Sequence, residues 1–502
     1  MADRTGTEFH PVRMVSVAAI PFLVLVALYV SNVPIGQPFF LIYRYSPFLG
    51  VRIPTALMGL LIASMGLYAL FHALRSSDRP RGLTSAVILL SYASVAAWTL
   101  FAAPHYAAQH VFNMLSPSHD GAFVLESRPS LSVREYVSRS FFERLKLAPE
   151  EMGGRRVLSN PPGVTVAAVM ARRVVRSVPP VERAIAWGFE LEELENRDQR
   201  YEFATAILLT IVFTFCWAAA VLPAYGLARL RLPAGAAIVV AVGSVFNPAT
   251  LCFTPGKDPA QLLGVLSILL FWMLAYERRK ALWGMAAGAV TLAASMIGLI
   301  HIWVFGIVAM ATLWHATFTG SRGTWLRRCA GPGVVGASVV ASLAYLALDW
   351  NVPLTLYAVA KRYGEIQLPI LTDPIYWMFI GLPMFFLFVG SILWVEVVAF
   401  RAPIADETAA LGRRILVCTI AAMTYSYLFA NNSETPRLWI PFIPLLIWGL
   451  ALRRAALRTD STSHRRVWVL LVALQVVFTL GHWCFMDARE SEWRLTTGRM
   501  WN

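Results

Sequence analysis

The sequence predicts an all-α polytopic membrane protein with about 13 transmembrane helices, and two observations carry this prediction. Hydrophobic residues make up 57% of the 502-residue chain and charged residues only 14%, whereas soluble domains carry about 25% charged residues. The apolar residues also form long runs, unlike the short alternating stretches of an outer-membrane barrel. We therefore expect a helical bundle in a membrane.

Each transmembrane helix needs about 20 mostly apolar residues. The block 281–318 is either two helices or one broken helix, with Gly298 and His301 at the place where a tight reversal would fall. The first run reaches Val30, too far for a signal peptide, and is read as a span. The predicted spans are 14–33, 54–74, 83–103, 204–228, 233–252, 260–276, 281–299, 301–318, 329–349, 375–400, 414–430, 438–452 and 467–485.

These runs divide the chain into three spans in 1–103, a long non-membrane segment at 104–203, and about ten spans in 204–502. With the N-terminus inside, short inner segments hold 21 of the 43 basic residues and short outer segments hold 9. Cytoplasmic loops are enriched in Lys and Arg, and long loops are exempt from that rule. The 104–203 segment is therefore predicted to be extracytoplasmic, on a cell inner (plasma) membrane.

The net charge of the chain is +14. Because the basic residues cluster in short loops, this charge fits contact with lipid headgroups better than binding of nucleic acid.

The 104–203 segment has the pattern of a folded cap with helices in the membrane interface. Apolar and basic residues alternate with helical spacing over Leu131–Leu147, which predicts an amphipathic helix with its basic side towards lipid phosphates. A second helix is predicted at Val164–Val178, ended by Pro179 and Pro180.

Two motifs in this segment bear on function. In the first, His119 and Asp120 precede a glycine, which places a carboxylate at a turn near the membrane. Half-buried there, Asp120 would serve as a general base towards a hydroxyl; the alternative is a turn or a helix cap. The second motif runs from Asn160 through two prolines to Gly163, and predicts a rigid turn into the next helix.

Three further motifs lie in later outer loops. Lys257 and Asp258 either bind a phosphate or pair with each other, or Asp258 caps the following helix. Glu434 and Arg437 are three residues apart and share a helix face; an arginine at membrane depth is a functional candidate whose planar fork suits a phosphate. Lys361 and Arg362 either hold an anionic lipid headgroup or are solvated charges. All five motifs lie on one side of the predicted membrane.

The sequence gives no clear metal constellation. The cysteines are scattered singly, which indicates neither a zinc site nor a disulfide framework. His119 and Asp120 alone do not make a metal site. No cofactor is predicted with certainty, and a divalent cation stays an open alternative.

With these motifs, the chain resembles the GT-C superfamily of polytopic glycosyltransferases, which use polyprenyl-phosphate-linked sugars. The resemblance rests on the number of spans and on the acidic motif at His119-Asp120-Gly121. It also rests on the Pro-Pro-Gly turn after Asn160, the Pro-x-x-Asp-like hairpin ending at Asp258, and the Glu434–Arg437 pair before a span.

The resemblance implies transfer of a sugar from a polyprenyl-phosphate-linked donor to an acceptor, and it assigns roles to the candidate residues. Asp120 would activate the acceptor, with His119 beside it. Lys257, Lys361, Arg362 and Arg437 would hold the lipid-linked phosphate, with Asp258, Glu434 and Asn160 in the same substrate site. The partners implied are a polyprenyl-phosphate sugar donor, a glycan, lipid or protein acceptor, and membrane lipids. Attack opposite the phosphate would invert the anomeric centre.

Two alternatives to a transferase are open. A transporter or flippase of lipid-linked saccharides would show ionisable residues inside the spans and pseudo-symmetric halves, and the sequence shows few of the former and no internal repeat. A non-catalytic membrane assembly protein would use the 104–203 segment as a docking surface.

Overall fold

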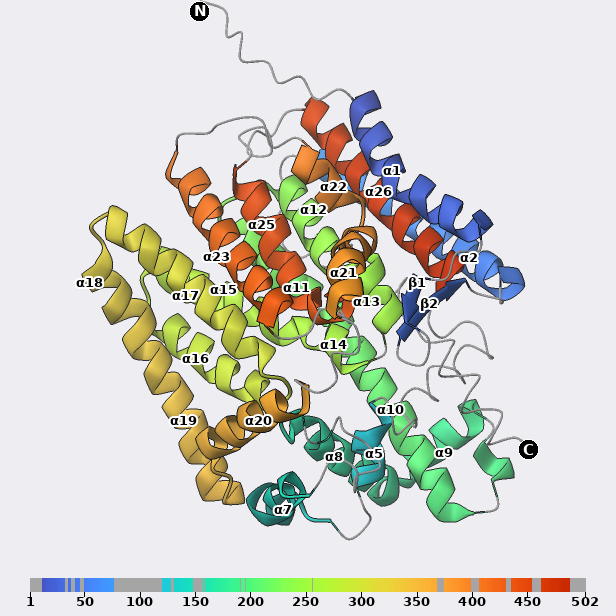
Figure 1. Ribbon diagram of the computed structural model, residues 1–502, viewed down its shortest axis with the longest axis vertical. Helices are drawn as coiled ribbons and strands as arrows, with labels where there is room; N and C mark the ends of the chain where they lie inside the picture. The colour runs from blue at the N-terminus through green and yellow to red at the C-terminus, as the bar shows by residue number, and fades with distance from the viewer. Residues whose placement is uncertain are drawn as a thin grey trace, which may run out of the picture.

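The computed structural model in Figure 1 shows a bundle of long helices with a group of short helices at one end. The predicted span 83–103 lies outside the described residues, and so do His119 and Glu434. The structure describes residues 11–31, 35–37, 41–45, 49–75, 120–127, 131–147, 157, 159–189, 191–194, 196–254, 256–367, 374–398, 406–429, 435–453 and 462–487.

Helices form nearly all of the regular structure, as the long apolar runs predict. The bundle contains α1 (Pro11–Ser31), α2 (Leu49–Arg75), α10 (Arg197–Ala219), α11 (Val221–Arg229), α12 (Ala234–Val245), α13 (Pro248–Phe253), α14 (Lys257–Ala260), α15 (Leu262–Arg278), α16 (Ala281–Ser295), α17 (Ile300–Phe318), α18 (Arg322–Trp325), α19 (Gly331–Leu348), α20 (Val352–Gln367), α21 (Pro374–Val389), α22 (Ser391–Val398), α23 (Glu407–Phe429), α24 (Thr435–Leu438), α25 (Ile443–Arg453) and α26 (Thr462–Phe485). The exception is a small antiparallel sheet of β1 (Ile35–Gln37), β2 (Leu41–Tyr45) and β3 (Met486–Asp487), in that order. The sheet pairs Ile35 with Tyr43 and Arg44 with Asp487. It therefore joins the connection between α1 and α2 to the end of α26.

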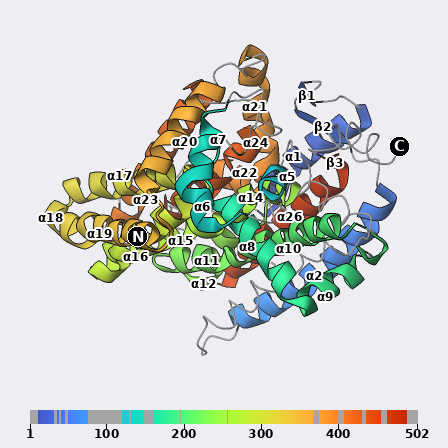
Figure 2. The same ribbon diagram turned by 90° about the horizontal axis from the view of Figure 1, so that it is seen from below.

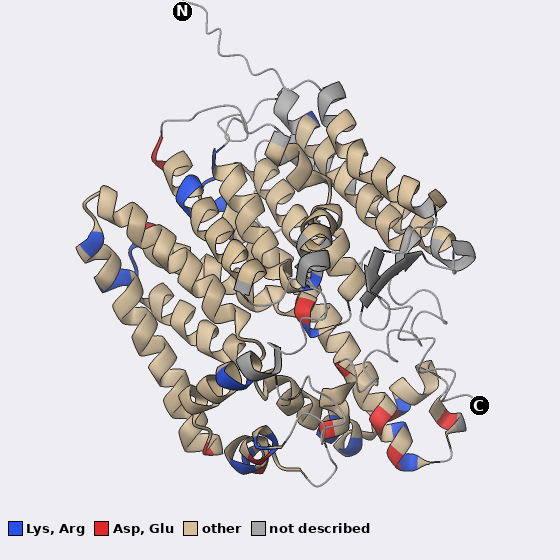
Figure 3. Ribbon diagram, in the orientation of Figure 1, with Lys and Arg blue, Asp and Glu red and all other residues tan. Residues whose placement is uncertain are grey.

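Six described helical segments are long and apolar enough to cross a membrane, and their length and composition indicate an integral, multi-pass membrane protein. They are Arg197–Arg229, Ala234–Phe253, Lys257–Arg278, Ile300–Phe318, Arg322–Leu348 and Arg466–Cys484. Shorter apolar helices lie at four more of the predicted spans, namely Val15–Leu28, Ile53–Gly66, Ala281–Ser295 and Ile440–Arg453. Figure 3 shows most charged residues at the two ends of the bundle and few along its middle.

The six segments differ in how deeply they lie in the bundle. In the segment of α12 and α13, 94% of the most apolar window is buried within the protein. In the segment that ends with α19, only 17% of the corresponding window is buried. The first is therefore the centre of the bundle, where α12 packs against α25 and α26 and α13 packs against α26. The second presents most of its apolar surface outward, as a lipid-facing helix does.

The block 281–318 forms two helices, α16 and α17, which pack against each other. Gly298 lies in the turn between them, where its carbonyl oxygen is 2.8 Å from Nδ1 of His301. Of the two predicted alternatives for this block, two separate helices is therefore the one that the structure shows.

The short helices at one end form what we call the cap, which contains α5 (Gly121–Glu126), α6 (Val133–Glu135), α7 (Phe141–Leu145), α8 (Gly163–Ser177) and α9 (Pro179–Gly188). A π-helical turn at Tyr136–Ser140 joins α6 to α7, so the helix predicted at Leu131–Leu147 is confirmed. The helix predicted at Val164–Val178 is confirmed as α8. In Figure 2 the cap lies in front of the bundle, with α7 beside α20 and α9 beside α10.

Ion pairs fasten the cap internally and to the bundle. Arg176 pairs with Asp198 at 2.9 Å, which ties α8 to α10. Arg200 pairs with Glu182 at 3.1 Å, which ties α10 to α9. Arg144 belongs to the basic side of Leu131–Leu147, for which lipid phosphates are the predicted partners, but it pairs with Glu126 of α5 at 3.0 Å. The chain thus supplies its own carboxylate to this arginine.

Pro161, Pro162 and Gly163 form the turn that docks the cap on the bundle. The Gly163 N–H donates a 2.7 Å hydrogen bond to the carbonyl oxygen of Met296, in the turn between α16 and α17. A Cβ atom on Gly163 would lie 2.4 Å from that oxygen. This close approach of two backbones requires glycine.

Gly163→Ala is therefore expected to lower the thermal unfolding midpoint of the purified protein by several degrees, because the turn must move and lose its hydrogen bond. A cost of about 1–3 kcal/mol is typical of such overpacking. The matched control is Gly188→Ala at the end of α9, where an added Cβ meets no atom within 4 Å. Equal melting temperatures for the two variants would contradict the docking role.

Candidate functional site

Asp120 lies at the junction of cap and bundle. It occupies the N-cap position of α5, but its side chain makes no capping hydrogen bond to that helix. Instead Oδ2 accepts a 2.7 Å hydrogen bond from the backbone N–H of Lys257, which is 137 residues away in the sequence. With 4% of its surface exposed, Asp120 is a buried carboxylate held by a tertiary contact, and the helix-cap alternative is wrong for its side chain.

Lys257 and Asp258 begin α14, and their side chains pair. Lys257 Nζ lies 3.2 Å from Asp258 Oδ1, and the Gln261 side-chain amide donates to the same oxygen at 3.0 Å. The cap residue of α14 is Gly256, so the prediction that Asp258 caps this helix is wrong. Local sequence favours capping, but donors from the side chains around it engage the carboxylate instead.

Arg437 completes the cluster from α24. Its Nε atom lies 3.2 Å from Asp258 Oδ2, so two cations approach the two oxygens of one carboxylate. The side chains of Lys257, Asp258 and Arg437 are each less than a fifth exposed. We call the set Asp120, Lys257, Asp258, Gln261 and Arg437 the junction cluster.

The junction cluster rests on the turn that also receives the cap. His301 of α17 is buried, with Nδ1 2.8 Å from the Gly298 carbonyl oxygen and Nε2 3.3 Å from the Gln261 carbonyl oxygen. Gln261 thus contacts this histidine through its backbone carbonyl oxygen and Asp258 through its side-chain amide. A continuous path of contacts therefore links the α16–α17 turn, the start of α15 and the cations.

The other predicted site residues have different surroundings. Asn160 donates to Ser159 at 3.2 Å within the docking turn. Arg362 of α20 donates to the carbonyl oxygen of Leu147 at 2.6 Å, which ties α20 to the end of α7, and Lys361 is exposed. Phosphate binding by Lys361 and Arg362 stays a prediction.

Two residues in this region are not among those predicted from the sequence. Gln261 belongs to the junction cluster, and His301 supports it. The signal for Gln261 is its spacing of three from Asp258, which puts both side chains on one helix face. No motif marks His301, because its partners are backbone carbonyl groups.

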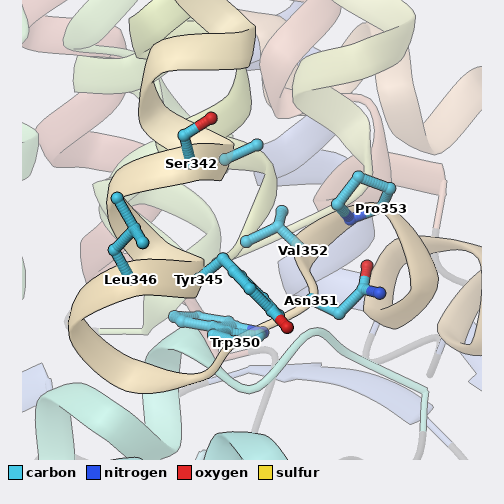
Figure 4. A pocket seen from close by; sticks show the side chains of 8 residues that line it. Ser342, Tyr345, Leu346, Trp350, Asn351, Val352 and Pro353 are labelled. Carbon is cyan, nitrogen blue, oxygen red and sulfur yellow. The ribbon is translucent and has the colours of Figure 1, made fainter.

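A separate open groove of about 430 Å³ lies where α19 turns into α20, shown in Figure 4. Its lining contains no charged side chain, and Trp350 within it donates its indole N–H to Thr355 at 3.0 Å. The groove is lined by Ala341, Ser342, Tyr345, Leu346, Trp350, Asn351, Val352 and Pro353. Acid–base or phosphate chemistry needs charged groups, so the junction cluster is the better candidate site.

The chemistry of the junction cluster follows from its side chains. The buried Asp120 carboxylate supplies a proton acceptor. The two cations that pair with Asp258 can bind an anion, and fixed charges act strongly in a poorly hydrated site. Among the described residues, no three His, Cys, Asp or Glu side chains gather as metal ligands would.

Comparison with known proteins adds no relative: no protein-family model matches the chain, and no curated protein matches it.

Proposed function

We propose that this protein is a membrane glycosyltransferase that moves a sugar from a polyprenyl-phosphate donor to an acceptor hydroxyl on the extracytoplasmic face. The observation that carries the proposal is the meeting of Asp120, Lys257, Asp258 and Arg437 in one buried cluster. Three distant parts of the chain supply these residues, at the place where the cap meets a membrane bundle. A lipid-linked substrate reaches such a place from the bilayer.

In the proposed reaction, Asp120 accepts the proton of the acceptor hydroxyl as its oxygen forms a bond to the anomeric carbon of the sugar. The bond between that carbon and the phosphate oxygen breaks, and the electron pair leaves with the phosphate. Lys257 and Arg437 stabilise the charge that develops on the leaving group. Attack opposite the phosphate inverts the anomeric centre.

The finer features of a GT-C-like enzyme belong to the same proposal. They are a bundle of about 13 spans and a cap on the extracytoplasmic side of the inner membrane. Support comes from the contact of the cap with the end of the bundle where Lys257 and Arg437 both pair with Asp258. The phosphate-binding cations and the proposed base must face the same compartment. Lys361, Arg362 and Asn160 are proposed as outer contacts for the substrates.

The proposal is tested by reconstituting the full chain into vesicles that contain polyprenyl-phosphate sugars labelled in the sugar. We expect release of polyprenyl phosphate together with a labelled product, at a rate that scales with the amount of protein. Movement of intact donor between leaflets with no release of polyprenyl phosphate would instead identify a flippase and overturn the proposal.

A further inference from the structure

Asp258 binds both cations of the junction cluster at once. Lys257 Nζ and the Gln261 amide approach Oδ1 at 3.2 and 3.0 Å, and Arg437 Nε approaches Oδ2 at 3.2 Å. One carboxylate therefore engages the same cations that bind the donor phosphate in the proposed function.

A carboxylate and a phosphate make similar demands on these donors. Lysine and arginine bind either anion through charge-assisted hydrogen bonds, and the arginine fork matches both. The four charged side chains of the cluster sum to a formal charge of zero. A phosphate that entered with Asp258 still in place would add negative charge beside a carboxylate, in a site too buried for solvent to screen the repulsion.

Building on the proposed function, we propose that Asp258 is a tethered competitor of the phosphate. It occupies Lys257 and Arg437 when no donor is bound, and it releases at least one of them when the phosphate arrives. Because Asp258 follows Lys257 directly in the chain, it stays close enough to take the cations back. Its return displaces the product phosphate after transfer and keeps the site from being trapped by its product.

The test is the binding of short-chain polyprenyl phosphate, and separately of inorganic phosphate, to the full chain in detergent. Asp258→Asn keeps the size of the side chain and removes its charge. We expect the variant to bind polyprenyl phosphate about tenfold more tightly than the wild type, because a like charge has been removed from the site. It should also melt at a lower temperature without ligand and gain more from ligand, since its cations lack a counter-charge.

The control is Asp198→Asn, which removes the exposed carboxylate that pairs with Arg176 in the cap and should leave phosphate affinity unchanged. A gain with both probes indicates that the cations recognise phosphate itself, whereas a gain with the lipid alone indicates that the lipid chain must place it. Affinity in Asp258→Asn equal to or below that of the wild type would overturn the competitor role while the proposed function stood. If neither wild type nor variant binds either probe, the proposed donor site fails and the competitor role fails with it.

A charge-balanced variant covers the case in which Asp258→Asn does not fold. Lys257→Gln combined with Asp258→Asn leaves Arg437 without a competing carboxylate and restores neutrality to the pair. It should bind polyprenyl phosphate at least about threefold more tightly than Lys257→Gln alone, which keeps the competitor. Equal or weaker binding by the double variant would contradict the proposal.

Discussion

Replacing Asp120 with asparagine is expected to reduce sugar transfer by about 10²- to 10⁴-fold, the range that a positioned general base contributes. Asparagine retains an oxygen that accepts the hydrogen bond from the Lys257 N–H, so the junction of cap and bundle should persist. The loss should therefore fall on kcat, with donor affinity and the melting temperature close to those of the wild type. The measurement is release of polyprenyl phosphate in vesicles, with donor binding measured in parallel.

Asp198→Asn is the matched control for this change. Asp198 is also an aspartate near the cap, but 80% of its side chain is exposed and its partner is Arg176. An exposed ion pair contributes about 0–1 kcal/mol to stability, so transfer should stay within about twofold of the wild type. Full activity in Asp120→Asn would remove this carboxylate as the base.

Arg437→Gln is expected to lower kcat/KM for the polyprenyl-phosphate donor by about 100-fold, because a fixed cation that stabilises the leaving phosphate is lost. The glutamine retains polar contact with Asp258 but not the charge. Arg437→Lys should recover part of the activity, since it restores the charge without the planar fork. Steady-state kinetics with varied donor concentration separate this effect from a loss of folded protein.

Arg139→Gln provides the corresponding control for a lost arginine charge. Arg139 lies in the cap and pairs with Glu143 one helical turn later, with 78% of its side chain exposed. Its replacement should leave the donor kinetics unchanged. Donor kinetics for Arg437→Gln that match those of Arg139→Gln would show that Arg437 does not contact the phosphate.

Local patterns in the sequence predicted the elements better than they predicted the contacts between them. Long apolar runs specify helices in a membrane almost without regard to context, and the cap helices follow from the spacing of apolar residues. Pro179 and Pro180 were read as the end of α8, and they also begin α9. Proline fits the first turn of a helix as well as it ends one, so this local signal was ambiguous.

The residues of the site could be selected individually, but their pairing could not. Capping is a local interaction, and the sequence around Asp258 favours it. The carboxylate instead engages Arg437 because the bundle brings α24 against the start of α14, a tertiary contact that no local pattern contains. The hydrogen bond from the Lys257 N–H to Asp120 is likewise a tertiary contact, between residues 137 positions apart in the sequence.

The most direct test is the structure of the full chain with a non-cleavable phosphonate analogue of a polyprenyl-phosphate sugar bound. The phosphonate oxygens should contact Lys257 Nζ and the Arg437 guanidinium, with the sugar lying between the phosphonate and the Asp120 carboxylate. A phosphonate bound at Lys361 and Arg362 or in the α19–α20 groove, with the junction cluster unchanged, would contradict a single transfer site at the meeting of cap and bundle.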